Sequence, residues 1–386
     1  MRPVSDGVGI LKETRGPMID VNDLRRPASL LHGLVRADEA YTLYYDETNN
    51  IRRLLLAGEG LNVPELKCFV LGGIGHAGSD RPIDLAPLRR SARIQPNAPE
   101  LKFEYFGKGD FPAVLASPRI TAFLEWVAEQ GFLAHYLTLD PFYWSTVDII
   151  DSVLTDADAV QLHAIAPQLK SDLYGVLRSD LVRTTALLSR YNFPDVGRER
   201  RADFLKEIRR CLEDESESLD DFSYQMLKGV LQIGERGASL PFLEDEEPVV
   251  LIDTFADFFL ERLSILKHAD HVLDTEEVII KRVAALDLRD GDLPFRNYRF
   301  IERSHDEPGV QASDVMVGLL GKFFSWIVET DLETVGRARA ELSPIQARNA
   351  QMLAALLDRS TDENAALANT IISLVDQEKA FVFLQS

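Results

Sequence analysis

The sequence has few cysteines and a deficit of positive charge. Its 386 residues include two cysteines, Cys68 and Cys211, which lie far apart and share no metal-binding spacing. A disulfide framework is therefore excluded, and a reducing compartment is expected. Lysine and arginine number 42 against 62 aspartates and glutamates, for a formal net charge of -20. This acidity argues against a broad basic surface for nucleic acid but leaves room for a local basic groove.

Long apolar runs are missing as well. No run approaches the ~20 residues that a membrane-spanning helix needs. The opening residues, MRPVSDGVGILKETRG, lack the apolar core of a signal peptide. We therefore expect a cytoplasmic protein without membrane contact. Repeats and low-complexity tracts are also absent, and the length suits either several domains or one domain with a large insertion.

Residues 1–38 form a polar extension that contains Pro and Gly. The region after it is rich in strand patterns. In YTLYYD, Tyr41, Leu43 and Tyr45 alternate with Thr42, Tyr44 and Asp46, as in a strand. Further strands are expected at 52–56, 67–75, 100–106 and 132–140. A helix is expected from Pro118, with Ser117 as its N-cap and Gly131 at its end.

The hydrophobic periodicity becomes helical from about residue 144. Helical patterns continue to about residue 266, including 249–266, and strands return at 271–277 and 296–304. A further helix is expected from Gln311, followed by a polar helical tail. Strands mixed with crossover helices predict an α/β fold. The expected parts are an extension at 1–38, a discontinuous core at 39–143 and 265–330, an all-helical insertion at 144–264 and a helical tail at 331–386.

Two acidic motifs stand out in this pattern. Asp46 and Glu47 end the first core strand, where the bland interpretation is a solvated strand end or a turn. Asp314 lies in the apolar helix beginning QASDVMVGLLG, where a carboxylate without a partner is costly to bury. Gln311 shares its helix face. Capping of the helix start is the structural alternative for Asp314.

These motifs resemble the family called domain of unknown function 3800, which is similar to the ribonuclease H-like superfamily. The usual Asp-Glu-Ser-Gly at the strand end is here Asp46-Glu47-Thr48-Asn49, and QxxD is Gln311 to Asp314. GGIG at 72–75, ELK at 100–102 and VLD at 272–274 also fit. The resemblance covers roughly 40–143 and 265–325. It implies a ribonuclease H-like mixed sheet flanked by helices.

The resemblance also implies chemistry. Such enzymes gather carboxylates from separate elements around one or two divalent metals and hydrolyse a phosphodiester. Hard oxygen ligands suit Mg²⁺ or Mn²⁺. The expected catalytic residues are Asp46, Glu47, Asp274 and Asp314. The expected metal ligands are Asp46, Asp140, Asp274 and Asp314. Gln311, Lys102 and Glu104 are expected to support them.

Several of these residues have simpler interpretations. Asp140 precedes Pro141, a common way to open a turn, and Asp274 could cap the following helix. Lys102 and Glu104 could form an ion pair along one strand. His268 and His271 could bind zinc with nearby aspartates, but no third soft ligand is evident. His76 and His305 are less favoured candidates for an acid or base.

Partners follow from the same features. Basic residues gather at 88–93 and 198–210, which are candidate phosphate contacts, although the second segment alternates with acids like a solvated helix face. The leading hypothesis is a metal-dependent nuclease or phosphoesterase acting on RNA or DNA. The alternative is a non-catalytic interaction protein on the same fold, a component of a defence or stress system that binds a protein partner through the insertion.

Overall fold

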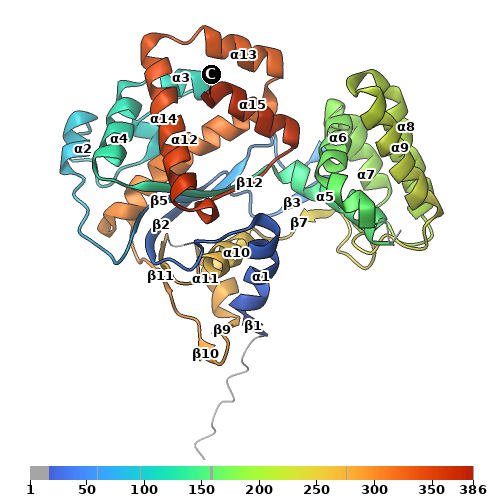
Figure 1. The fold of residues 1–386 in the computed structure, drawn as a ribbon, viewed down its shortest axis with the longest axis horizontal. Coiled ribbons are helices and arrows are strands. Elements are labelled where there is room, and N and C mark those ends of the chain that lie inside the picture. Colours follow the sequence, from blue (N-terminus) through green and yellow to red (C-terminus); the bar gives the residue numbers. More distant parts are fainter. Residues whose placement is uncertain (1–16, 59, 96, 157–159, 275, 386) are drawn as a thin grey trace, which may run out of the picture.

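Six strands form a central mixed sheet in the order β11-β8-β2-β5-β6-β12 (Figure 1). The computed structural model describes residues 17–385, apart from residues 59, 96, 157–159 and 275. Strands β2, β5 and β6 are antiparallel neighbours, β8 and β11 add in parallel beside β2, and β12 runs parallel to β6. The strand bounds are β2 Tyr41–Thr48, β5 Phe69–Ala77, β6 Leu133–Leu139, β8 Asp270–Leu273, β11 Tyr298–Phe300 and β12 Ala368–Ile371.

Helices cover both faces of this sheet and give the three-layer α/β architecture that the sequence predicts. The first face carries α2 Ala86–Ser91, α3 Phe111–Leu115, α4 Pro118–Glu129, α12 Pro308–Glu329, α13 Leu332–Ala340, α14 Pro344–Glu363 and α15 Leu374–Gln385. The opposite face carries α1 Val21–His32, α10 Ala256–Ile265 and α11 Glu277–Ala284. Ser117 caps α4 by accepting the N–H of Arg119, as expected.

Strand β2 is buried on both faces because helices lie above and below it. Tyr41, Leu43 and Tyr45 belong to the core on the α10 side, whereas Tyr44 belongs to the core beneath α12. The alternation seen in the sequence therefore separates two cores rather than a core and solvent. Asp46 shares the Tyr44 side of the strand, so it points toward the α12 layer.

Helix α12 lies unusually close to β2 and β5. The Ser313 hydroxyl donates to the Tyr44 carbonyl at 2.8 Å and accepts the N–H of Ile74 at 3.1 Å. A Cβ on Gly73 would lie 2.1 Å from Oγ of Ser313, so the contact requires glycine there. This bond network fixes the residue next to Asp314 against the two central strands.

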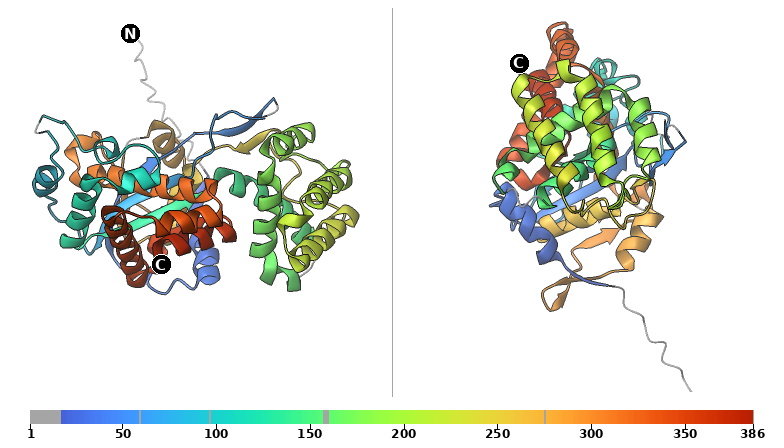
Figure 2. Two further views of the ribbon diagram at one scale, coloured as in Figure 1. Left: turned by 90° about the horizontal axis from the view of Figure 1, so that it is seen from above. Right: turned by 90° about the vertical axis from the view of Figure 1, so that its right-hand side faces the viewer.

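A helical lobe stands at one end of the sheet (Figures 1 and 2). It contains α5 Pro141–Asp156, α6 Ala166–Ser179, α7 Leu181–Arg190, α8 Arg201–Asp214 and α9 Asp221–Arg236. These helices fill most of the segment predicted as an insertion, but that segment is not all helical. Within 249–266, β7 Val250–Ile252 pairs with β3 Leu54–Ala57, which also pairs with β4 Gly60–Leu61. The apolar run VLI is too short to distinguish a strand from a helix by periodicity.

Three other sequence predictions need correction. Residues 100–106 form a loop with a 3₁₀ turn at Phe103–Tyr105 instead of a strand. The tail is not an appended helical segment, because its strand β12 joins the central sheet and its helices α14 and α15 pack on the core. In the extension, β1 Met18–Asp20 pairs with β9 Asp287–Asp290, which also pairs with β10 Leu293–Pro294. Residues 1–16 lie outside the described residues.

Across the part of the chain that the structure describes, no helix combines the length and apolarity needed to cross a bilayer.

Candidate carboxylate site

Strand β2 places two neighbouring acids near one edge of the α12 layer. Asp46 is 8% exposed, and its Oδ1 accepts the N–H of Glu47 at 2.7 Å. Because side chains alternate along a strand, the Glu47 side chain points to the opposite side of β2 from that of Asp46. The interpretation of Asp46 as a solvated strand end is therefore wrong, because this carboxylate is buried.

Helix α12 supplies the third acid, Asp314. The helix begins at Pro308 with Glu307 as its N-cap, so Asp314 lies in the second turn and does not cap the helix. Its Oδ1 accepts the N–H of Phe103 at 2.6 Å, and its Oδ2 lies 3.2 Å from Nζ of Lys102. Asp314 thus connects α12 to the loop that carries these two residues.

Gln311 holds that loop from one turn earlier in α12. Its Oε1 accepts the N–H of Leu101 at 2.9 Å and a guanidinium N–H of Arg89 at 3.3 Å. Its Nε2 donates to the carbonyl of His305 at 3.0 Å. The supporting role predicted for Gln311 therefore has a physical basis, since the amide positions the backbone that precedes Lys102.

Asp274 completes the group from a third element. It directly follows β8, and its N–H donates to the carbonyl of Tyr45 at 3.3 Å. The N-cap position of α11 is Glu276, two residues after Asp274, and the Glu276 side chain makes no capping hydrogen bond. Parallel pairing of β8 with β2 brings Asp274 to the strand end where Asp46 and Glu47 lie.

The charges of Asp314, Glu47 and Asp274 all act on the carboxylate of Asp46. Burial raises the pKa of Asp46 well above its usual value, and Asp314, Glu47 and Asp274 raise it further. Burial also raises the pKa of Glu47 to about 7, with added repulsion from Asp274 and Glu276. A buried carboxylate whose pKa is raised by three neighbouring acids marks a place that favours added positive charge.

Lys102 supplies part of that charge. Burial alone would lower the pKa of its ammonium, but the carboxylates of Asp314 and Asp46 raise it. Burial raises the pKa of Asp314, and this rise is opposed by the Phe103 N–H and by Lys102. The expected Lys102–Glu104 ion pair is not formed, since Lys102 turns to Asp314 and the exposed Glu104 lines the groove over the acids.

Asp140 does not join this group. It follows β6, and its Oδ1 accepts the N–H of Phe142 at 2.8 Å at the start of α5. Its Oδ2 accepts from the hydroxyl of Tyr174 and lies 3.8 Å from the guanidinium of Arg178. Both oxygens are thus engaged in joining the sheet to the helical lobe, and the prediction of Asp140 as a metal ligand is corrected.

The histidine candidates also lie elsewhere. His271 is buried and its ring contacts the Tyr45 hydroxyl and the Leu266 carbonyl, whereas His268 lies 3.6 Å from Asp38. The two histidines therefore face different partners and give no shared zinc site. His76 contacts the Ala77 carbonyl, and the exposed His305 lies beside Asp306.

The basic segment at 198–210 is a solvated, paired surface. Arg198 pairs with Glu244, Arg209 with Glu213 and Glu235, and Arg210 with Glu207. In the segment at 88–93, Arg89 is directed at Gln311 and the Ala98 carbonyl. The positive charge near the acids comes instead from Lys102 and from two further lysines, Lys67 and Lys322, that were not predicted from the sequence.

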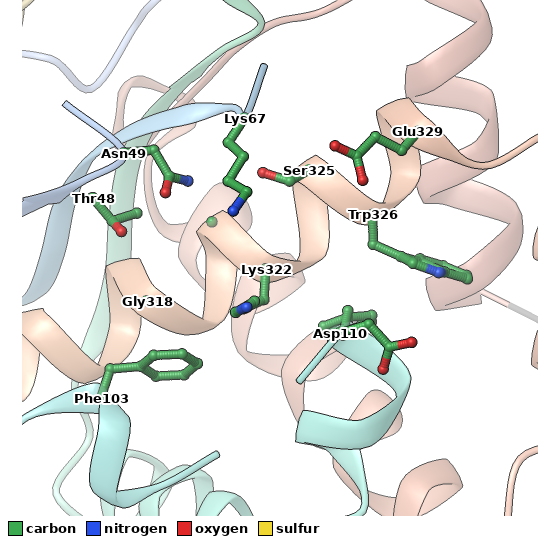
Figure 3. A pocket seen from close by; sticks show the side chains of 12 residues that line it. Thr48, Asn49, Lys67, Phe103, Asp110, Gly318, Lys322, Ser325, Trp326 and Glu329 are labelled. Carbon is green, nitrogen blue, oxygen red and sulfur yellow. The ribbon is translucent and has the colours of Figure 1, made fainter. Parts of the chain in front are cut away.

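Two of those lysines, Lys67 and Lys322, line a pocket that adjoins the acids (Figure 3). Lys322 and Ser325 follow Asp314 at helical spacing on the same side of α12, which is a signal that the sequence contains. Lys67 precedes β5 and carries no such signal. Among the described residues, no group of three or more His, Cys, Asp or Glu side chains is arranged to hold a metal ion.

Comparisons with known proteins identify no relative. No protein-family model matches the chain, and neither a curated protein nor a solved structure matches it.

Proposed function

We propose that this protein is a metal-dependent nuclease or related phosphoesterase of ribonuclease H-like type. The observation that carries this proposal is that Glu47, Asp274 and Asp314, which come from three separate elements, gather around the buried carboxylate of Asp46. The strand order gives independent support. Three antiparallel strands with parallel strands added beside the first are what we expect of a ribonuclease H-like sheet.

The donor set suits Mg²⁺ or Mn²⁺. Carboxylate oxygens are the ligands that these hard cations prefer. Asp46, Asp274 and Asp314 would hold the metal, with Glu47 beside them, and Gln311 and Lys102 would keep the Asp314 side in place. Among the described residues the acids are not arranged around a cation, so metal binding requires their side chains to move. A bound metal would activate water and stabilise the leaving oxygen of a phosphodiester.

Calorimetric titration with Mn²⁺ and Mg²⁺ tests this proposal. Wild-type protein should bind Mn²⁺ in the micromolar to low-millimolar range, and Asp46→Asn and Asp314→Asn should abolish binding, because each removes a charged ligand. Asp257→Asn is the matched control, since Asp257 is exposed on α10. Labelled RNA and DNA would then be offered with Mn²⁺. Absence of metal binding by the wild type would contradict the proposal.

A second candidate is a non-catalytic interaction protein that binds a partner through the helical lobe. Large apolar side chains are exposed there, with Val182 on α7 at 70% and Phe222 on α9 at 69%. The pairing of Asp314 with Lys102 also fits a structural role for that acid. Asp46 favours the enzyme, because no lysine or arginine among the described residues forms an ion pair with this buried carboxylate.

A further inference from the structure

A recessed pocket of about 180 Å³ lies along α12 next to the acids. Thr48, Phe103 and Gly318 line both this pocket and the groove that contains Glu47, Lys102 and Asp314. The two hollows are therefore parts of one continuous surface. Asp314 and Lys322 lie on the same helix, so a ligand that follows α12 would pass from the acids into the pocket.

Two lysines from different elements converge in this pocket. Figure 3 shows the side chains of Lys67 and Lys322 reaching into its middle, with the Ser325 hydroxyl and the Asn49 amide beside them. Among the described residues, Lys322 forms no ion pair, and Lys67 has a partner in Glu65, at 3.0 Å between exposed side chains. An exposed pair of this kind is weak, so a phosphate could replace it.

Glycines on α12 allow the residues that line the pocket to pack closely against this helix. Gly321 faces Thr48, where an added Cβ would lie 2.5 Å from its Cγ2, and Gly318 faces the ring of Phe103. Asn49 adopts a φ of 58° and donates through Nδ2 to the Cys68 carbonyl at 2.8 Å. Thr48 and Asn49, which follow the acid pair, thus form part of the pocket wall.

The remaining walls suit a nucleoside. Phe103 and Trp326 lie at opposite sides of the lysines, and the acids Glu329 and Asp110 lie at the Trp326 end (Figure 3). Asp110 is occupied as the N-cap of α3, where it accepts the N–H of Ala113 at 2.9 Å. The two lysines therefore lie in the middle of the pocket between two aromatic side chains, and Glu329 and Asp110 lie at one end of it.

We propose that this pocket binds one unpaired nucleotide, with its phosphate between Lys67 and Lys322 and its base or sugar against the aromatic walls. The proposal rests on the proposed function, because it makes the pocket the neighbour of the phosphodiester held at the acids. Lysine ammonium groups bind phosphate as point charges, and aromatic side chains accept any base. The pocket is too small to enclose a whole nucleotide, so part of the nucleotide would lie in the adjoining groove over the acids. Because a base must be unpaired to reach the aromatic walls, we expect single strands to be preferred over duplexes.

The test is fluorescence anisotropy with a short labelled single strand, offered as RNA and as DNA, in EDTA so that no cleavage occurs. Lys322→Ala should weaken binding at fixed salt and lower the slope of log K against log salt by about 1. Lys322→Arg should keep the wild-type slope. Lys206→Ala is the matched control for Lys67→Ala, because Lys206 is an exposed lysine of the helical lobe paired with Asp203.

Each outcome separates this proposal from the nuclease proposal. If the wild type does not bind the strand, or if Lys67→Ala and Lys322→Ala bind it as tightly as wild type, the pocket is not a nucleotide site, whatever Mn²⁺ does. If Lys322→Ala loses strand binding while the wild type binds no Mn²⁺, the proposal of a nucleotide-binding pocket is supported and the proposal of metal-dependent hydrolysis is contradicted. The circular dichroism spectrum and melting temperature of Lys322→Ala should match those of the wild type, which shows that the variant is folded whether or not the protein binds Mn²⁺.

Discussion

The ammonium group of Lys102 lies 3.2 Å from Oδ2 of Asp314, while the next residue in the chain donates its N–H to Oδ1 of the same carboxylate. One loop therefore supplies both a cation and a backbone donor to an acid of the helix facing it. The charges of Asp314 and Asp46 raise the pKa of Lys102 in return. The loop acts as a built-in counter-charge for a group of acids that would otherwise repel one another.

Replacing Lys102 by methionine should lower the stability of the metal-free protein. The change keeps much of the side-chain volume but leaves Asp314 without its cation, at a cost of about 1 kcal/mol for a partly exposed pair. Mn²⁺ should then raise the melting temperature of Lys102→Met more than that of wild type, because the metal replaces the missing charge. Thermal melts with and without Mn²⁺ measure both effects. Equal metal-induced shifts would contradict this role, and Lys281→Met, at an exposed lysine of α11, is the control.

Gly318→Ala should damage the site through packing alone. An added Cβ would lie 2.3 Å from Cγ of Phe103, so the loop must move away from α12 and the bond from the Phe103 N–H to Asp314 must lengthen. We expect a loss of about 1–3 kcal/mol in the free energy of unfolding and weaker Mn²⁺ binding. Chemical denaturation and calorimetry measure these. Gly336→Ala in α13 is the matched control, because its Cβ would meet no atom within 4 Å and should stabilise the helix.

Asp140→Asn should separate stability from metal binding. The substitution removes the charge that faces Arg178 and weakens the acceptor for Tyr174, in a position that is 1% exposed. Breaking such a buried pair costs about 3–5 kcal/mol. Denaturant unfolding should show this loss, whereas Mn²⁺ affinity measured well below the melting temperature should equal that of wild type. A loss of metal affinity in the folded variant would return Asp140 to the ligand set.

Asp148→Asn should stabilise the protein only toward neutral pH. Burial, with repulsion from Asp151, raises the pKa of Asp148 from 3.8 to about 6. A raised folded-state pKa contributes stability that is fully present below the unfolded value and is lost as pH rises through the folded value. The neutral amide avoids that loss.

The expected gain from Asp148→Asn is therefore near zero at about pH 4 and on the order of 1–3 kcal/mol at about pH 7. Urea unfolding at both pH values provides the measurement. Asp257→Asn, at an exposed aspartate of α10, should show no such difference. A gain of equal size at both pH values would show that the effect of Asp148→Asn does not come from ionisation.

The sequence by itself determined the elements whose signals are local. The alternation in YTLYYD predicted β2, and Ser117, Pro118 and Gly131 delimited α4. Asp314 could be selected because an apolar helix is an unusual place for a carboxylate, and Asp46 and Glu47 because they form an acid pair at the end of a strand. Period, capping and turn chemistry act over a few residues, so these features survive in the folded protein.

Tertiary structure alone decided which acids meet and what accompanies them. Asp140 and Asp274 both follow strands, but pairing of β8 with β2 brings Asp274 to the acids, whereas Asp140 faces α6. Lys102 lies in a loop instead of the predicted strand, because Gln311 and Asp314 accept the backbone N–H groups of the residues on either side of it. Lys67 and Lys322 converge because glycines let α12 approach β2 closely. Such contacts depend on strand order and helix packing, which are set by burial of the whole core and are not encoded in any short segment.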